Sequence, residues 1–102
     1  MKVKPGRAKD FVKIFQEKVV PTAMKEPGLR RLYLLRSIDQ ENEFVGFSLW
    51  NSEKDAENYV KSGHYQNNLE KLDLLLDSEP IVEKFMVEKH AVGRSVRPSR
   101  KK

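Results

Sequence analysis

The sequence has no cysteine among its 102 residues. This absence excludes disulfides, thiolate metal ligands and a thiol nucleophile, and small secreted scaffolds usually depend on disulfides. The first residues, MKVKPGRAKD, contain no apolar run of the kind that a signal peptide needs, and no later run approaches the roughly 20 apolar residues that span a bilayer. We therefore expect a cytoplasmic protein without a membrane partner.

Histidine is also scarce, because the chain has only His64 and His90. They are far apart in sequence, show no HxxxH spacing and have no cysteine beside them, so we expect no metal site. Glycine-rich phosphate loops and Ser-His-Asp arrangements are absent as well. The sequence therefore gives no support for nucleotide-dependent chemistry or for a catalytic triad.

Positive charge is concentrated at the C-terminal end. The chain has 20 basic and 15 acidic residues, and five of the basic residues with no acidic residue fall in residues 91–102. This tail has no aromatic side chain on which a base could stack, so nucleic acid is not the expected partner. We predict one folded domain over residues 1–90 and a basic, disordered tail over residues 91–102.

Apolar residues near the N-terminus recur at helical spacing. They predict an amphipathic helix that begins near Ala8, with an apolar face formed by Phe11, Ile14, Phe15, Lys18 and Val19. Pro21 should kink or end this helix, because proline removes a backbone donor. A second short helical piece is expected over residues 22–26, before Pro27 and Gly28.

Two strands are predicted next, at residues 29–38 and 43–50, joined as an antiparallel hairpin. Side chains alternate between the faces of a strand. In the first strand, Leu32 and Leu34 therefore point to one face, and Tyr33 and Leu35 point to the other. In the second strand, Phe44 and Trp50 point to the face opposite to that of Val45, Phe47 and Leu49. Both faces of the sheet are apolar. Because helices cover only one face of a two-layer domain, the other face should meet a second subunit, a ligand or both.

The remaining elements complete an α+β pattern. Ser52 and Asp55 resemble a helix cap, Gly63 suits a helix stop, a further helix is expected over residues 64–76, and a last strand over residues 81–90. A very short first strand, MKVK, precedes them. The order is βαββαβ, which predicts a ferredoxin-like fold with a four-stranded antiparallel sheet.

Several segments are together similar to a known family. They are KPGRAKDFVKIFQEKVVP, EPGL and SLWNSEKDAENYVKSGHYQ, and their order resembles the antibiotic biosynthesis monooxygenase (ABM) domain family. The resemblance implies a homodimer in which two four-stranded sheets form an α+β barrel, with an apolar cavity between each sheet and its helices. Members of the family include cofactor-independent monooxygenases that act on phenols and quinols, and haem-degrading enzymes.

The resemblance also implies candidate site residues. Trp50 matches a strand-ending tryptophan that faces the cavity, and its indole can donate a hydrogen bond but cannot remove a proton. His64 has a side chain suited to a general base. Aromatic residues expected to line a substrate site are Tyr33, Phe44, Phe47 and Tyr59. Each of these has a structural alternative: the aromatic rings can fill the core, and His64 can be a surface residue at a helix start.

The functional hypothesis is a cofactor-independent monooxygenase that acts on a small aromatic, phenolic or quinol substrate. An alternative stays open, namely a non-catalytic ligand-binding or dimerisation module, because positions where the family's enzymes carry catalytic residues hold Gly46, Ala56 and Leu69 here. Haem degradation is not expected, because Tyr59 and Leu69 replace residues that the haem-degrading members use. Whether the chain is an enzyme is left open at this point.

Overall fold

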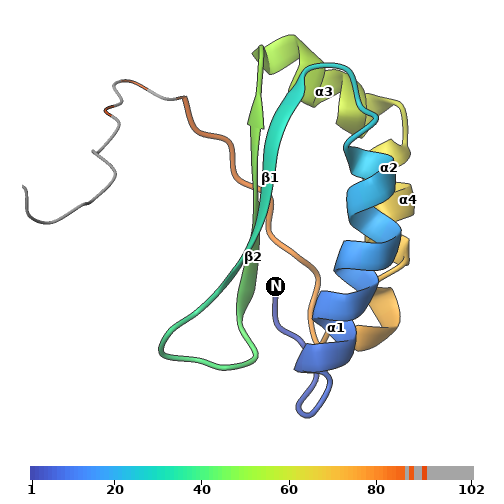
Figure 1. Ribbon diagram of the computed structural model, residues 1–102, viewed down its shortest axis with the longest axis vertical. Coiled ribbons are helices and arrows are strands. Elements are labelled where there is room, and N and C mark those ends of the chain that lie inside the picture. Colours follow the sequence, from blue (N-terminus) through green and yellow to red (C-terminus); the bar gives the residue numbers. More distant parts are fainter. Residues whose placement is uncertain (87, 89–90, 92–102) are drawn as a thin grey trace, which may run out of the picture.

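The computed structural model describes residues 1–86, 88 and 91. A layer of helices stands against one face of an antiparallel sheet (Figure 1). The predicted α+β class is confirmed. The predicted tail, residues 91–102, lies outside the described residues except for Ala91.

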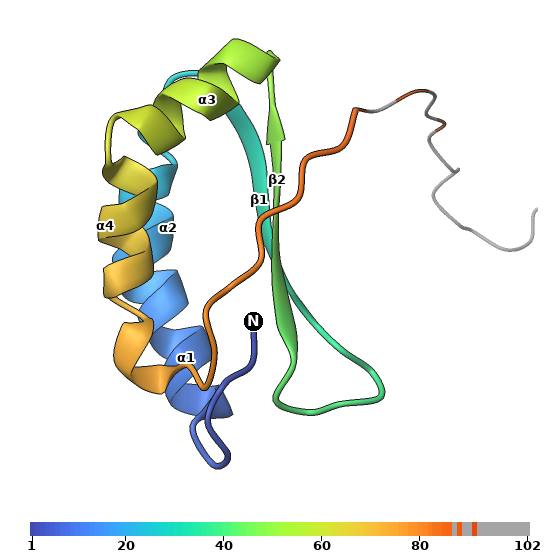
Figure 2. The same ribbon diagram turned by 180° about the vertical axis from the view of Figure 1, so that it is seen from behind.

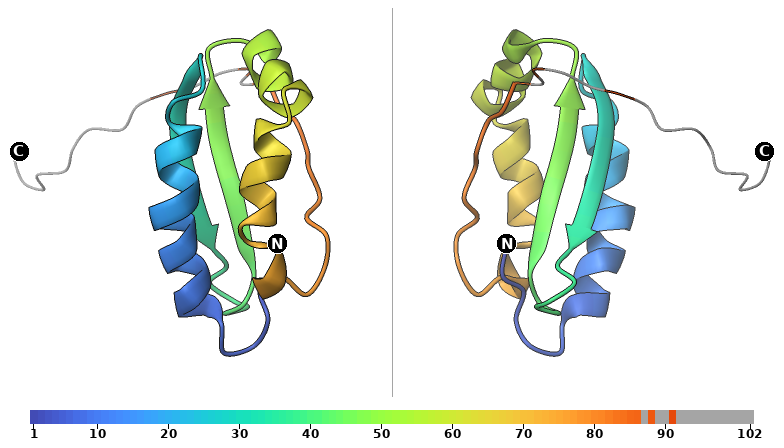
Figure 3. Two further views of the ribbon diagram at one scale, coloured as in Figure 1. Left: turned by 90° about the vertical axis from the view of Figure 1, so that its right-hand side faces the viewer. Right: turned by 90° about the vertical axis from the view of Figure 1, so that its left-hand side faces the viewer.

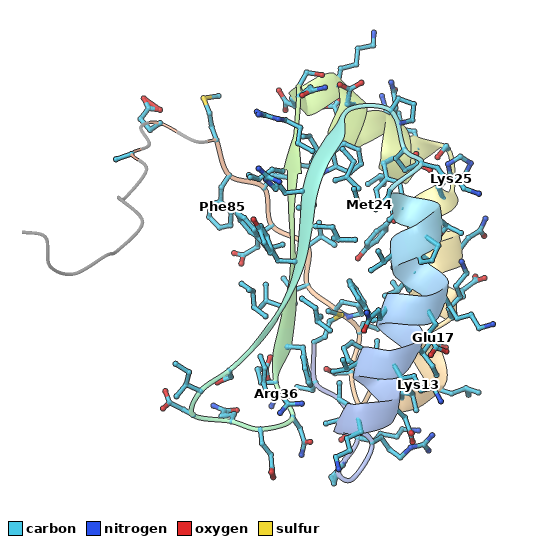
Figure 4. All side chains as sticks on the ribbon, viewed as in Figure 1. Lys13, Glu17, Met24, Lys25, Arg36 and Phe85 are labelled. Atoms are coloured by element: carbon cyan, nitrogen blue, oxygen red, sulfur yellow. The ribbon has the colours of Figure 1, made fainter. Side chains whose placement is uncertain are left out.

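The first helical stretch runs without a break through three elements. These are α1 (Ala8–Ile14), the π-helix η1 (Phe15–Val19) and α2 (Val20–Ala23). Its sheet-facing side chains are buried and spaced by four residues, at Phe11, Phe15, Val19 and Ala23. Lys13, Glu17 and Lys25 point away from the sheet (Figure 4). Lys18 is exposed, so its predicted place on the apolar face was wrong.

Pro21 does not end the helix. It lies in the first turn of α2, directly after the π-helical turn. Proline lacks the N–H group that would bond to the carbonyl four residues earlier, and a wider turn before it accommodates this loss. The helix ends at Ala23, so the second piece is shorter than the predicted span of residues 22–26.

The sheet is the predicted hairpin. Strands β1 (Leu29–Arg36) and β2 (Phe44–Trp50) pair antiparallel, with Leu34 opposite Gly46 and Tyr33 opposite Phe47. Leu32 and Leu34 pack against the core on the helix side. On the other face four large apolar side chains are 42% to 53% exposed, and this outer face comprises Tyr33, Leu35, Val45 and Phe47. No helix of the described part covers it (Figure 3). The prediction of two apolar faces is confirmed.

The first strand is as short as predicted. Lys2 and Val3 form isolated bridges to Glu43 and Leu76. The last strand is not confirmed: residues 81–86 have no regular secondary structure, and residues 87, 89 and 90 lie outside the described residues. Residues 77–86 pass the β2 side of the sheet (Figure 2), and Phe85 lies on the side away from the helices (Figure 4). The described sheet therefore has two strands, rather than four.

The second helical stretch contains α3 (Glu53–Lys61), α4 (His64–Glu70) and the 3-10 helix η2 (Asp73–Leu75). The Ser52 cap is confirmed, because its side chain accepts a hydrogen bond from the Asp55 N–H group at 3.1 Å. The predicted helix over residues 64–76 is divided after Glu70. A 3-10 turn places residues three apart on one side, and this turns both Leu72 and Leu75 into the core.

The apolar core lies at one end of the space between the layers. Phe11 is fully buried and Phe44 is 1% exposed, with ring centroids 5.0 Å apart. The other buried members of the cluster are Val3, Phe15, Val19, Leu72, Leu75 and Leu76. These come from α1, η1, the N-terminal segment, β2 and the region of η2. The opposite end of the molecule, where β2 meets α3, has a different composition.

Candidate functional site

Three aromatic rings gather where β2 meets α3 and α4. The Trp50 and Tyr59 ring centroids are 5.3 Å apart, and the Tyr59 and Tyr65 rings meet edge to face at 5.8 Å. Trp50 lies close to α3 because it is the last residue of β2, and the cap of α3, Ser52, follows only two residues later. All three side chains are partly exposed. We call Trp50, Tyr59 and Tyr65 the aromatic cluster.

The indole N–H group of Trp50 is used within β2. It donates a hydrogen bond to Ser48 Oγ at 3.0 Å. An indole has a single donor and no acceptor. The group that the sequence suggested for orienting a ligand oxygen is therefore already paired, and Trp50 offers the face of its ring.

His64 has a carboxylate partner that the sequence did not reveal. Its Nδ1 lies 2.7 Å from Glu26 Oε2, and the side chains are 55% and 13% exposed, respectively. A carboxylate at Nδ1 favours the tautomer that carries its proton there, which leaves Nε2 able to accept one. The structure thus gives His64 the orienting group that a general base requires.

The turn that presents Glu26 depends on Gly28. Gly28 has a φ of +84°, and a Cβ atom there would collide with the Asp55 side chain. Its carbonyl accepts a hydrogen bond from the Asn51 N–H group at 2.8 Å. Glycine is required for both the positive φ and the close approach. The EPGL segment therefore holds Glu26 beside the start of α4.

A buried polar residue stands behind the aromatic cluster. Asn68 is 5% exposed, and its Nδ2 donates to the Tyr59 hydroxyl oxygen at 2.8 Å. Its Oδ1 accepts from Thr22 Oγ1 at 2.6 Å and from Lys71 Nζ at 2.9 Å. Lys71 Nζ also donates to the Lys18 carbonyl at 3.0 Å. We call Tyr59, Asn68, Thr22 and Lys71 the Asn68 network; it joins α2, α3 and α4.

Burial raises the pKa of the Tyr59 phenol above its ordinary value of 10.0; the Asn68 hydrogen bond opposes this change and the Glu26 charge adds to it. Burial likewise raises the pKa of Tyr65, with a smaller contribution from Tyr59. Both phenols are therefore neutral near pH 7 and can donate hydrogen bonds. Neither acts as a base at that pH.

The six predicted site residues fall into three places. Trp50, Tyr59 and His64 lie at the same end of the molecule. Tyr33 and Phe47 stack on the outer face, with ring centroids 6.2 Å apart and an interplanar angle of 26°. Phe44 is in the core. Sequence reasoning missed Glu26 and Asn68; a polar residue among the apolar positions of a helix was the only available signal, and only for Asn68.

A cavity of about 230 Å³ lies at the other end of the molecule. It is lined by Lys2, Val3, Pro5, Gln40, Glu41, Asn42, Glu43 and Asp77. None of the six predicted residues lines it, so it is not the expected substrate site. Within the described residues, no group of three His, Cys, Asp or Glu side chains could hold a metal ion. No helix in that part of the chain has the length and apolarity to cross a membrane.

Comparison with known proteins identifies the family. The model of the antibiotic biosynthesis monooxygenase family matches residues 1–71, which is more than half of the chain. The chain belongs to the ABM family. The match includes both strands, the aromatic cluster, the Glu26–His64 pair and Asn68. The sequence-based recognition is therefore confirmed.

Solved structures show the same fold. The chain is similar to a conserved protein from Methanosarcina mazei Go1, with 19% identity, coverage of 76% of each chain and a TM-score of 0.64. It is also similar to a "Putative antibiotic biosynthesis monooxygenase from Nitrosomonas europaea", with 22% identity, coverage of 76% of this chain and 74% of that one, and a TM-score of 0.64. A search of curated proteins gave no match.

Proposed function

We propose that this ABM chain is a cofactor-independent monooxygenase that oxidises a small aromatic, phenolic or quinol substrate bound at the aromatic cluster. The family is generally monooxygenase-like. The observation that supports this site is the Glu26–His64 pair, since it places an oriented proton acceptor at the same end of the molecule as Trp50 and Tyr59.

Each group has a role in this proposal. The rings of Trp50 and Tyr59 pack against the substrate ring. His64 Nε2 accepts the phenol proton while Glu26 holds the proton on Nδ1. The resulting phenolate is electron-rich and reduces dioxygen: one oxygen atom enters the ring, the other leaves as water, and the ring C–H and phenol O–H supply its two hydrogens. A positioned base contributes about 10²–10⁴-fold to such a reaction.

The test uses 1-naphthol, which becomes 1,4-naphthoquinone with one water released. Purified protein under ¹⁸O₂ should give quinone with one labelled oxygen. His64→Ala should lower the rate by about 10²-fold or more, and Trp50→Phe by less. Gln66→Ala, at an exposed position of α4, is the matched control. Equal rates for the unmodified chain and the His64 and Trp50 variants would remove both residues from the mechanism.

The second candidate is a non-catalytic ligand-binding module. It is favoured by the Trp50 N–H group being paired with Ser48, and by Gly46, Ala56 and Leu69 offering no acid or base. Binding of 1-naphthol without quinone formation would support this candidate. Titration with haem, where we expect no shift of the Soret band, separates both candidates from haem degradation.

We also propose a homodimer built on the outer face. Members of the family are commonly dimeric, and the four exposed side chains of that face form a continuous apolar surface over paired strand positions. Sedimentation at micromolar concentration should give a dimer, and Phe47→Lys should give a monomer. A monomeric unmodified chain would contradict the proposal. Cytoplasmic location stays a prediction.

A further inference from the structure

The orientation of the Asn68 amide is determined by its neighbours. Oδ1 faces the Lys71 ammonium group at 2.9 Å and the Thr22 hydroxyl at 2.6 Å. Rotating the amide by half a turn would place its NH₂ group against an ammonium group that has only donors. Asn68 Nδ2 must therefore face the Tyr59 oxygen, 2.8 Å away.

This arrangement fixes how Tyr59 uses its hydroxyl group. A phenol oxygen accepts from one partner and donates its proton to another. Because the oxygen accepts from Asn68, the proton points elsewhere, and the hydroxyl makes no second hydrogen bond to the described residues. Tyr59 belongs to the partly exposed aromatic cluster, in ring contact with Trp50. The site thus presents one donor beside a flat apolar surface.

We propose that Asn68 is a positioning residue that directs the Tyr59 hydroxyl proton toward a ligand, so that the site selects aromatic ligands carrying an oxygen that accepts hydrogen bonds. Such an oxygen is the carbonyl of a quinone or the oxyanion of a deprotonated phenol. Burial keeps the phenol protonated, which is the state that this role requires. The inference rests on the proposed function only in using the same site; it does not require turnover.

The test compares two ligands of nearly equal shape. 2,3-Dimethyl-1,4-naphthoquinone carries carbonyl oxygens and has no free position on its quinone ring for attack by an amine. 2,3-Dimethylnaphthalene carries no oxygen. Dissociation constants are measured by equilibrium dialysis, which needs no spectroscopic signal. Tyr59→Phe removes the donor. It should weaken quinone binding about 3- to 10-fold, the effect of one hydrogen bond, and change hydrocarbon binding less than about twofold.

Asn68→Asp is the decisive variant, because it leaves Tyr59 in place. A carboxylate at this position still accepts from Lys71 and Thr22, but its other oxygen would accept a hydrogen bond from the Tyr59 hydroxyl and so turn that proton away from the ligand. Quinone binding should therefore weaken as much as in Tyr59→Phe, with hydrocarbon binding unchanged. Asn67→Asp, one residue earlier at an exposed position, is the matched control for charge and should bind both ligands normally. Thermal unfolding verifies that each variant is folded.

The outcomes separate the alternatives. Unchanged quinone affinity in Asn68→Asp, equal losses for both ligands, or an unmodified chain that binds neither ligand would each overturn the inference. If Asn68→Asp does not fold, Lys71→Met is the second variant, because it frees the Asn68 amide to rotate. It should reduce the preference for the quinone over the hydrocarbon. A preference equal to that of the unmodified chain would contradict the inference. Retained selectivity without oxidation of 1-naphthol would leave the inference standing while the monooxygenase proposal fails.

Discussion

The two ends of the space between the sheet and the helices differ in the burial and polarity of the residues that fill them. At the core end, Phe11, Phe44 and Val3 are at most 1% exposed. At the other end, the aromatic cluster is partly exposed and the buried member is the polar Asn68. Apolar burial is the main source of stability, whereas a buried amide requires hydrogen-bond partners. We infer that the core end holds the fold together, whereas the cluster end contains the residues for which a function is proposed.

The largest expected effect is a substitution in the core. Phe11→Ala should lower the free energy of unfolding by about 3–5 kcal/mol, because it leaves a cavity that the surrounding helices cannot fill. Tyr65→Ala at the partly exposed cluster end should cost clearly less. Urea unfolding followed by circular dichroism measures both. Equal losses at the two ends would contradict the division of roles.

A smaller effect is expected from the Asn68 network. Asn68→Ala should lower the free energy of unfolding by about 1–3 kcal/mol, because the Tyr59 and Thr22 hydroxyls lose a partner in partly buried positions. Asn67→Ala, at an exposed position of the same helix, should stay within about 0.5 kcal/mol of the unmodified chain. Matching values for the two variants would show that the network does not stabilise the fold.

The Glu26–His64 pair should contribute still less to stability. Because His64 is largely exposed, Glu26→Gln should change the free energy of unfolding by less than about 1 kcal/mol. The same substitution should lower the rate of 1-naphthol oxidation by more than the factor that corresponds to this change in stability, because a neutral amide no longer stabilises the positive charge that the His64 ring gains when it accepts the phenol proton. A loss of stability without any change in rate would assign the pair a structural role only.

The smallest effect is confined to alkaline pH. The pKa values of Tyr59 and Tyr65 are raised above 10.0 by burial. A phenol with a raised pKa in the folded state contributes stability that is fully present below pH 10 and is lost as the pH rises through the folded pKa. The urea concentration at the midpoint of unfolding should therefore decrease as the pH is raised above 10. The fall should be shallower in Tyr59→Phe, and identical curves would contradict this assignment.

Local patterns in the sequence predicted most of the fold. Alternation in residues 29–38 and 43–50 was enough to assign both faces of the hairpin, and the Ser52 cap and the Gly63 stop were identified from residue type. The π-helical turn was not predicted, because Pro21 indicated a kink but not the kind of helical turn that precedes it. The division of the last helix after Glu70 also depended on tertiary packing, since burying Leu72 and Leu75 together favours a 3-10 turn.

The site was only partly predictable. Trp50, Tyr59 and His64 were selected from residue type and from the resemblance, and the structure brings the first two into contact. Glu26 was missed because 38 residues separate it from His64 in sequence, and no local rule pairs residues so far apart. The Asn68 network was missed for the same reason, since it joins residues of three helices.

The π-helical turn at Phe15–Val19 carries one residue more than a regular helix would use. Each residue of an α-helix advances the chain by about 100° around the axis, so removing Gln16 would rotate everything after it by about that angle. Thr22 would turn away from Asn68, and Ala23 would leave the interior. The apparent surplus residue thus sets the phase between the two halves of the helix, and a shorter, more regular segment would misalign them.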